Sequence, residues 1–231
     1  MFNEVSTKLF ICSREYKKFD LFFSFAIAKL SHFLYIIEKN IDEPLNQEGE
    51  KMSLAEKLNY SIDDVLNLPE GERAELIDGQ LYMMSAPGRI HQKLSGFLHT
   101  EIADYIKKKS GDCEVYAAPF AVFLFADDTT YVEPDISVIC QKEKLTDQGC
   151  NGAPDFIIEI VSPSSQQRDY QTKLFLYRNA GVRLYWIVDP ENMRIIEYFF
   201  PENTFAIYTF SDRVPVKIYE DCTINFSSFS F

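Results

Sequence analysis

The stretch Asp155-Phe156-Ile157-Ile158-Glu159-Ile160-Val161 decides what kind of sheet this chain builds. It is short, rich in isoleucine and bounded by turn residues, which predicts a β-strand. It is also apolar on both faces, a pattern typical of a central strand that is covered on each side. Glu159 nevertheless stands within it. Because an unpaired buried carboxylate would cost several kcal/mol, we expect Glu159 to be neutralised, paired or bound to a cation.

A second carboxylate favours the interpretation that Glu159 binds a cation. Asp135 lies in Tyr131–Ile139, another apolar stretch that reads as a strand. If the two strands are neighbours, Asp135 and Glu159 can converge on one ion. Two carboxylates, the backbone carbonyl of Ile160 and waters suit Mg²⁺ or Mn²⁺. Such an ion can polarise a phosphodiester and activate a water.

A cationic side chain is available on the next predicted helix, which runs from about Asp169 to Ala180 and is stopped by Gly181. Asp169, Lys173 and Tyr177 occupy one face of it, at i, i+4 and i+8. Lys173 can therefore reach the predicted site, where an ammonium group would position the water and stabilise the charge of a phosphorane.

The remaining pattern predicts an α/β fold built on a mixed sheet. Ser61 is expected to cap a short helix through Leu66, and a longer helix is expected over Arg89–Lys109. Asp78-Gly79 predicts a tight hairpin. The other expected strands are Ala74–Ile77, Gln80–Met83, Glu114–Ala117, Ala121–Phe125, Leu184–Val188, Arg194–Phe199, Thr204–Phe210 and Pro215–Tyr219.

Four ordered motifs resemble a known family. They are Glu75-Leu-Ile-Asp78-Gly79, His91-Gln92, the segment from Gly152 to Ser164 with Asp155 and Glu159, and the segment from Gly181 to Pro190 with Tyr185-Trp186 and Asp189. With Glu133-Pro134-Asp135 they resemble a PD-(D/E)XK nuclease core, and more closely the Uma-two family of restriction-endonuclease-like proteins. The resemblance covers about Leu54 to Tyr219.

The resemblance implies a restriction-endonuclease-like mixed β-sheet flanked by helices and Mg²⁺-dependent nuclease chemistry, with Asp135 and Glu159 as metal ligands. By the same analogy Glu75, His91 and Gln92 are auxiliary residues of the site. The chain departs from the nuclease pattern at Val161, where a lysine is expected, and Lys173 would replace that lysine.

Simpler interpretations stay open for each residue. Glu159 and Lys173 would also suit a structural buried ion pair. Asp135 would suit the end of a strand, Glu75 a solvated strand position and His91 a helix start without function. Trp186 and the aromatic run Tyr198-Phe199-Phe200 suit a core or dimer surface better than a platform for bases.

The composition and net charge of the chain limit which binding partners are expected. The chain has 231 residues and a net charge of −12, which argues against broad, charge-driven nucleic-acid binding but allows a local basic groove. Its five scattered cysteines predict reduced thiols in a cytoplasmic protein. No membrane partner is expected, and the pattern leaves a homodimer open.

Residues 1–51 form an N-terminal extension that differs in composition from residues 52–231. Its apolar stretch is too interrupted by Lys29, Ser31 and His32 to predict a membrane span. The simpler interpretation is that translation begins at Met52, because Glu48-Gly49-Glu50-Lys51 can be encoded by a purine-rich ribosome-binding sequence.

Two functions follow from these patterns. The first is a metal-dependent nuclease that hydrolyses phosphodiester bonds, in DNA, with Asp135, Glu159 and Lys173 as its catalytic residues. The alternative is a catalytically silent nuclease-fold module that binds nucleic acid or a protein partner. A third and weaker interpretation is a structural cation site without chemistry.

Overall fold

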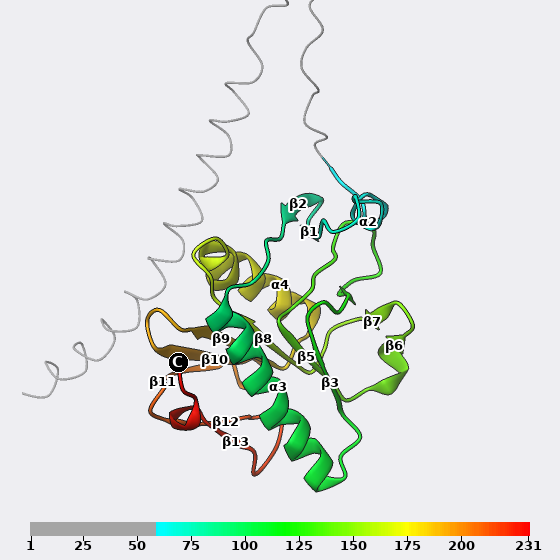
Figure 1. The fold of residues 1–231 in the computed structure, drawn as a ribbon. Helices are drawn as coiled ribbons and strands as arrows, with labels where there is room; N and C mark the ends of the chain where they lie inside the picture. Colours follow the sequence, from blue (N-terminus) through cyan, green and yellow to red (C-terminus); the bar gives the residue numbers. More distant parts are fainter. Residues whose placement is uncertain (1–58) are drawn as a thin grey trace, which may run out of the picture. The chain divides into compact units, whose positions relative to one another are not determined.

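The structure is a computed structural model that describes residues 59–231, and the N-terminal extension lies outside these residues. The centre is a six-stranded sheet with the order β11-β10-β9-β8-β5-β3 (Figure 1). Its strands are β3 (Glu114–Ala117), β5 (Ile136–Ile139), β8 (Phe156–Ile160), β9 (Leu184–Asp189), β10 (Arg194–Phe199) and β11 (Thr204–Thr209). Within this sheet β8 and β9 are parallel and the other neighbours are antiparallel, so the sheet is mixed as predicted.

Helices cover the two faces of the sheet. Helix α3 (Arg89–Lys109) packs Leu94, Leu98 and Ile102 against one face, where Phe156, Ile158 and Ile160 of β8 also lie. Helix α4 (Lys173–Ala180) packs Leu176 and Tyr177 against the opposite face, where Ile157 lies. Successive side chains of a strand point to opposite faces, so Glu159 lies on the face of α4. The prediction of a restriction-endonuclease-like mixed sheet flanked by helices is confirmed.

A small hairpin brings a third segment to the sheet. It consists of β1 (Ala74–Ile77) and β2 (Gln80–Met83), joined by Asp78 and Gly79 with φ angles of 50° and 75°. Two successive positive φ angles are the geometry that an Asp-Gly hairpin turn favours. Short helix α2 (Ile62–Leu66) precedes the hairpin and begins after Ser61, as predicted.

The long predicted strand Tyr131–Ile139 is wrong in its first half. Only Ile136–Ile139 joins the main sheet as β5. Tyr131 and Val132 instead form isolated bridges with Leu76 and Val122. Pro134 lies between the two parts, and a residue without an N–H cannot continue a ladder of hydrogen bonds.

Two other predicted strands also differ. Ala121–Phe125 is reduced to β4 (Val122–Phe123), which belongs to a separate three-stranded sheet with β6 (Leu145–Thr146) and β7 (Gly149–Asn151). Pro215–Tyr219 is not a strand. The chain forms β12 (Arg213–Pro215), turns, and returns as β13 (Thr223–Asn225), so Pro215 ends a strand instead of starting one.

The prediction of reduced cysteines is wrong for two of them. Cys113 and Cys140 form a disulfide between the residues that flank the paired strands β3 and β5. Cys150 and Cys222 are free and buried, whereas Cys12 lies outside the described residues. The cytoplasmic location, which rested on these thiols, stays a prediction. Among residues 59–231, no helix is long and apolar enough to cross a membrane.

The helix expected from about Asp169 begins with a different geometry. Residues Arg168–Thr172 form a π-helical turn, η2, and α4 begins at Lys173. Gly181 ends α4 in the left-handed conformation, with a φ angle of 92°. The π-turn matters for the site because it widens the helix by one residue per turn and changes which side chains face inward.

Candidate functional site

Glu159 is the centre of a buried polar cluster. Its side chain is 5% exposed, in the middle of the fully buried strand β8. Its Oε1 atom accepts hydrogen bonds from Lys173 Nζ at 2.7 Å and from the hydroxyl of Tyr177. The predicted helical face therefore does point at Glu159, and the buried pair with Lys173 that the sequence left open is present.

Lys173 joins three acidic residues. Besides Glu159, its ammonium group contacts Glu75 Oε1 at 2.8 Å and Asp169 Oδ1 at 3.9 Å. Glu75 is 1% exposed, so it is not the solvated strand residue that was considered. It also accepts a hydrogen bond from the backbone N–H of Glu133, which ties the hairpin to the segment before Asp135.

Asp135 lies beside Glu159 on the neighbouring strand. The β5–β8 register pairs Ile136 with Ile158, and its continuation by one residue places Asp135 opposite Glu159. Asp135 Oδ2 accepts the backbone N–H of Ile160 at 2.7 Å and lies 3.1 Å from His91 Nε2. His91 comes from the first turn of α3, so the cluster collects side chains from both faces of the sheet edge.

The structure does not bring Gln92 into this cluster. Gln92 is exposed, and its side chain makes no hydrogen bond with the residues that the structure describes. Its neighbour His91 points inward instead, because successive residues of a helix project about 100° apart.

Arg168 is a site residue that the sequence did not predict. Its Nε atom lies 3.6 Å from Glu75 Oε2, and its guanidinium group lies 5.0 Å from the centre of the Tyr82 ring. In a regular α-helix Arg168 and Lys173 would project about 140° apart. The π-turn between them brings both to the acidic cluster. Sequence periodicity alone carries no signal for such a turn.

The cluster holds more acids than cations. Glu75, Glu159 and Asp169 contact Lys173, and Glu75 also lies close to Arg168. Asp135 contacts His91. Burial raises the pKa of Glu159 well above its ordinary value, against the opposing charge of Lys173, and neighbouring carboxylates raise it further. Burial likewise raises the pKa of Asp169 to about 6.

Neighbouring carboxylates also raise the pKa of the basic groups of the cluster, whereas burial acts on these groups in the opposite direction. Burial would lower the pKa of Lys173, but Glu159 and its other acidic neighbours outweigh burial and raise it. The pKa of His91 is raised as well, because Asp135 outweighs the effect of burial. The site thus attracts positive charge, whether as protons or as a metal ion.

The oxygen donors fit a magnesium site of two protein carboxylates completed by waters. In the described part of the chain, the hydrogen bonds of Asp135 use only Oδ2 and those of Glu159 only Oε1. Hard oxygen ligands of this kind suit Mg²⁺. Among the same residues no group of three or more acidic, histidine or cysteine side chains is arranged so that it could hold one metal ion.

Comparison with known proteins identifies the family of this chain. The sequence profile of the Uma2 family, described as "Putative restriction endonuclease", matches residues 62–222. The chain belongs to the Uma2 family. The match spans α2 through the turn before β13, and it includes every residue of the acidic cluster.

Two further proteins are similar to this chain. The uncharacterized protein slr1290 of Synechocystis is 27% identical over 150 residues, which cover 63% of this chain and 77% of that protein. The crystal structure of a putative nuclease of the DUF820 family from Anabaena variabilis superimposes with a TM-score of 0.56 at 22% identity, covering 68% of this chain and 88% of the other. The second likeness establishes a shared fold. The family match supports a nuclease-like function.

Proposed function

We propose that this Uma2 protein is a metal-dependent nuclease that hydrolyses phosphodiester bonds in DNA. The observation that carries the proposal is the position of Lys173. Its ammonium nitrogen lies 2.7 Å from Glu159 Oε1, although it comes from a helix and not from the strand of Glu159. Val161, the strand position where nucleases of this kind carry lysine, packs in the apolar cluster on the same face.

The proposed division of roles follows from the contacts. Asp135 and Glu159 would hold a Mg²⁺ or Mn²⁺ ion, which supplies Lewis-acid polarisation of the scissile phosphodiester. Lys173 would place a fixed positive charge next to the phosphorane oxygens, in surroundings where water does not screen it. Glu75 and Asp169 would hold the ammonium group in position through their contacts with Nζ.

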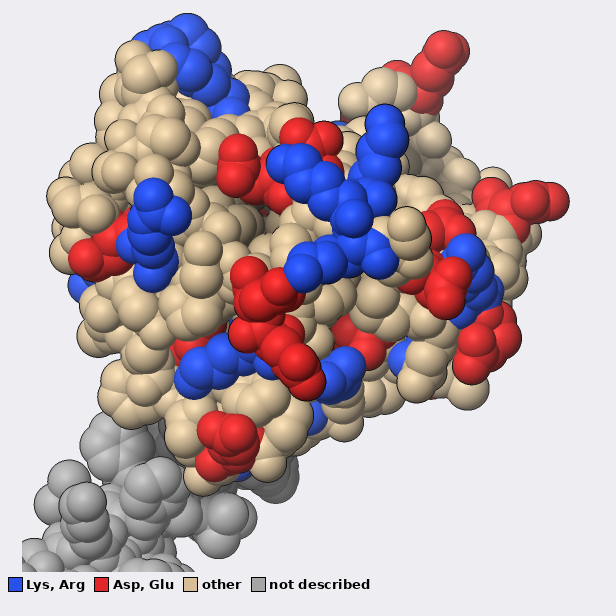
Figure 2. All heavy atoms as spheres, turned by 90° about the horizontal axis from the view of Figure 1, so that it is seen from below, with Lys and Arg blue, Asp and Glu red and all other residues tan. Residues whose placement is uncertain are grey.

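His91 and Arg168 would act at the rim. The imidazole of His91 orients Asp135 through their 3.1 Å contact. The side chain of Arg168 is 19% exposed beside Glu75, so its guanidinium would place a positive charge where a phosphate oxygen can approach the cluster. Because the net charge is −12, contact with DNA would depend on such local groups. On the face in Figure 2, Lys and Arg alternate with Asp and Glu instead of forming one basic surface.

A catalytically silent module that binds nucleic acid or a protein partner is the second candidate. One observation favours it: the Lys173 side chain is only 4% exposed, and its ammonium group is held between two carboxylates. A cation so fully neutralised can be structural. The two candidates differ in whether divalent ions bind at Asp135 and Glu159 and whether cleavage follows.

The test uses metal binding first and cleavage second. Mg²⁺ or Mn²⁺ should raise the melting temperature of the wild-type chain, because a ligand that binds only the folded state stabilises it. Asp135→Asn and Glu159→Gln should abolish this shift, whereas Asp63→Asn on α2 should keep it. Cleavage of single- and double-stranded DNA and RNA is then measured with Mn²⁺, with Asp135→Asn as the control. Metal binding without cleavage of any substrate would favour the silent module.

A further inference from the structure

Strand β11 is an edge without the usual protection. It is the last strand of the six-stranded sheet, and among residues 59–231 no strand pairs with its outer side. Its sequence, Thr204-Phe205-Ala206-Ile207-Tyr208-Thr209, contains no charged residue, proline or glycine. Edge strands usually carry such residues because an open, uncharged edge pairs with other chains. The opposite edge, β3, begins with Glu114 and is soon followed by Pro119.

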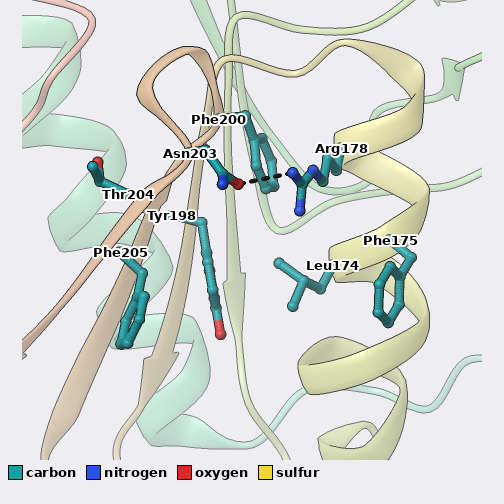
Figure 3. Close-up of a pocket in the computed structure, with 8 residues that line it drawn as sticks. All are labelled: Leu174, Phe175, Arg178, Tyr198, Phe200, Asn203, Thr204 and Phe205. Carbon is teal, nitrogen blue, oxygen red and sulfur yellow. Dashed lines mark hydrogen bonds between the residues drawn. The ribbon is translucent and has the colours of Figure 1, made fainter. Parts of the chain in front are cut away.

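Apolar side chains gather beside this edge. Phe205 and Ile207 are 66% and 61% exposed, and Phe175 of α4 is 63% exposed. A groove of about 290 Å³ runs between α4 and the β10–β11 hairpin. Figure 3 shows Tyr198 in this groove, between Phe205 and Leu174, with the hydrogen-bonded pair Arg178 and Asn203 at one end. Exposed apolar surface of this extent commonly marks an interaction site.

The backbone of β11 offers hydrogen bonds outward at the same residues. Phe210 donates its N–H to the carbonyl of Met193, toward β10. Along an antiparallel strand the direction of these groups alternates from residue to residue. The N–H and C=O groups of Phe205 and Ile207 therefore point away from β10. Thr209 agrees with this pattern, since its N–H donates to the side chain of Asp212 and not to β10.

We propose that β11 pairs in antiparallel orientation with β11 of a second copy of this chain, across a twofold axis at Ala206. In this register Phe205 lies opposite Ile207 of the second copy, and Ala206 lies opposite Ala206. The outward N–H and C=O groups of Phe205 and Ile207 then all find partners. The two Phe205–Ile207 pairs each join an aromatic to a β-branched side chain, a favourable combination.

Strand β11 is complementary to β11 of a second copy for two reasons. A twofold interface requires one patch to complement itself, and an uncharged, apolar strand meets no repulsion from an identical strand. The three exposed side chains offer roughly 350 Å² per copy, from their exposed fractions and typical side-chain areas. This is nearly half of the about 800 Å² that each partner buries in an interface of standard size, so the strand edge and the groove rim must contribute the rest.

The first experiment measures the assembly of the full chain. Sedimentation equilibrium should give a mass twice the 26.8 kDa of the chain. Ile207→Lys would place a charge in the interface and should raise the dimer dissociation constant roughly 100-fold or more. Met193→Lys, an exposed residue beyond the paired segment, should leave it unchanged. Circular dichroism melting confirms that both variants fold. A monomeric wild type, or a dimer unaffected by Ile207→Lys, would overturn the proposal.

The second experiment tests the register. Ala206→Cys places two thiols directly opposite each other, at a Cα separation that a disulfide can span. Mild oxidation should give a covalent dimer with this variant. Tyr208→Cys, whose partner in this register is Thr204, should not cross-link. A dimer that resists cross-linking at Ala206 would assign the interface to another surface, and a monomer in both experiments would indicate that the edge is covered within one chain.

Discussion

At the scale of the residue, the acidic cluster depends on the positive charge of Lys173. Lys173 makes its two short contacts with Glu159 and Glu75, which come from strands distant in sequence. Without its charge both carboxylates would be buried with too little compensation. The residue is therefore structural and, in our proposal, catalytic, and a test has to separate the two roles.

Lys173→Met should reduce single-turnover cleavage by roughly 100-fold or more, since a charge-stabilising donor is lost. Metal binding, measured by calorimetric titration, should persist because Asp135 and Glu159 remain. The control is Lys108→Met on the exposed end of α3. Adding Val161→Lys to the first variant should recover part of the rate. Equal rates for Lys173→Met and wild type would remove Lys173 from the mechanism.

Asp169 should make stability depend on pH. Its pKa rises from 3.8 in its ordinary state to about 6 in the folded chain. A raised carboxyl pKa means that the folded state holds the proton more tightly, so this stabilisation is complete below pH 3.8 and is lost as pH rises through 6. Metal-free wild type should therefore lose a few kcal/mol more than Asp169→Asn between pH 4 and pH 7. Urea unfolding at both values provides the measurement, and parallel pH profiles would contradict this prediction.

Local sequence patterns identified several residues that the structure brings together in the acidic cluster. Glu159 was found because a carboxylate in an apolar strand needs compensation, and Lys173 because it lies one helical turn from Asp169. Arg168 was not found, since its inward position depends on a π-turn. Gln92 is exposed and lies outside the cluster, and its role as an auxiliary residue stays a prediction. Its position next to His91 in the sequence does not determine which way a helix exposes it.

At the scale of the element, the sequence predicted the helices and hairpins whose structure depends on residues close together in the chain. The Asp-Gly hairpin and α3 follow from turn chemistry and helical periodicity within a single stretch. Different residues of the segment from Tyr131 to Ile139 form backbone pairs with Leu76, with Val122 and with β8. Which segments a strand pairs with depends on residues far away in the chain. The composition of the strand alone therefore does not predict its pairing.

The disulfide between Cys113 and Cys140 should stabilise the β3–β5 edge. It closes a loop with a sequence separation of 27 residues, and chain-entropy arguments give about 3–4 kcal/mol for a loop of that size. Cys113→Ser with Cys140→Ser should lower the free energy of unfolding by this order under oxidising conditions. A reducing agent should destabilise the wild type similarly and leave the double variant unchanged. Alkylation of both cysteines in the unreduced wild type would contradict the bond.

At the scale of the whole molecule, the six-stranded sheet is built from strands that all follow Met52 in the chain. We expect a chain that starts at Met52 to be soluble, to unfold cooperatively and to melt near the temperature of the full chain, because the clusters that pack around the sheet are formed by residues within 59–231. Differential scanning calorimetry of the two chains checks this. An insoluble shorter chain would show that residues 1–51 cover apolar surface.

The residues of the acidic cluster are widely spaced along the chain, and Glu75 and Lys173 are separated by 98 positions. During synthesis the N-terminal carboxylates leave the ribosome long before the lysine that compensates them. Contacts of such long range also form late and slowly in folding. A nascent chain shorter than about Lys173 therefore has no assembled cluster. The order of translation itself would keep the site unassembled until Lys173 has been synthesised and has left the ribosome.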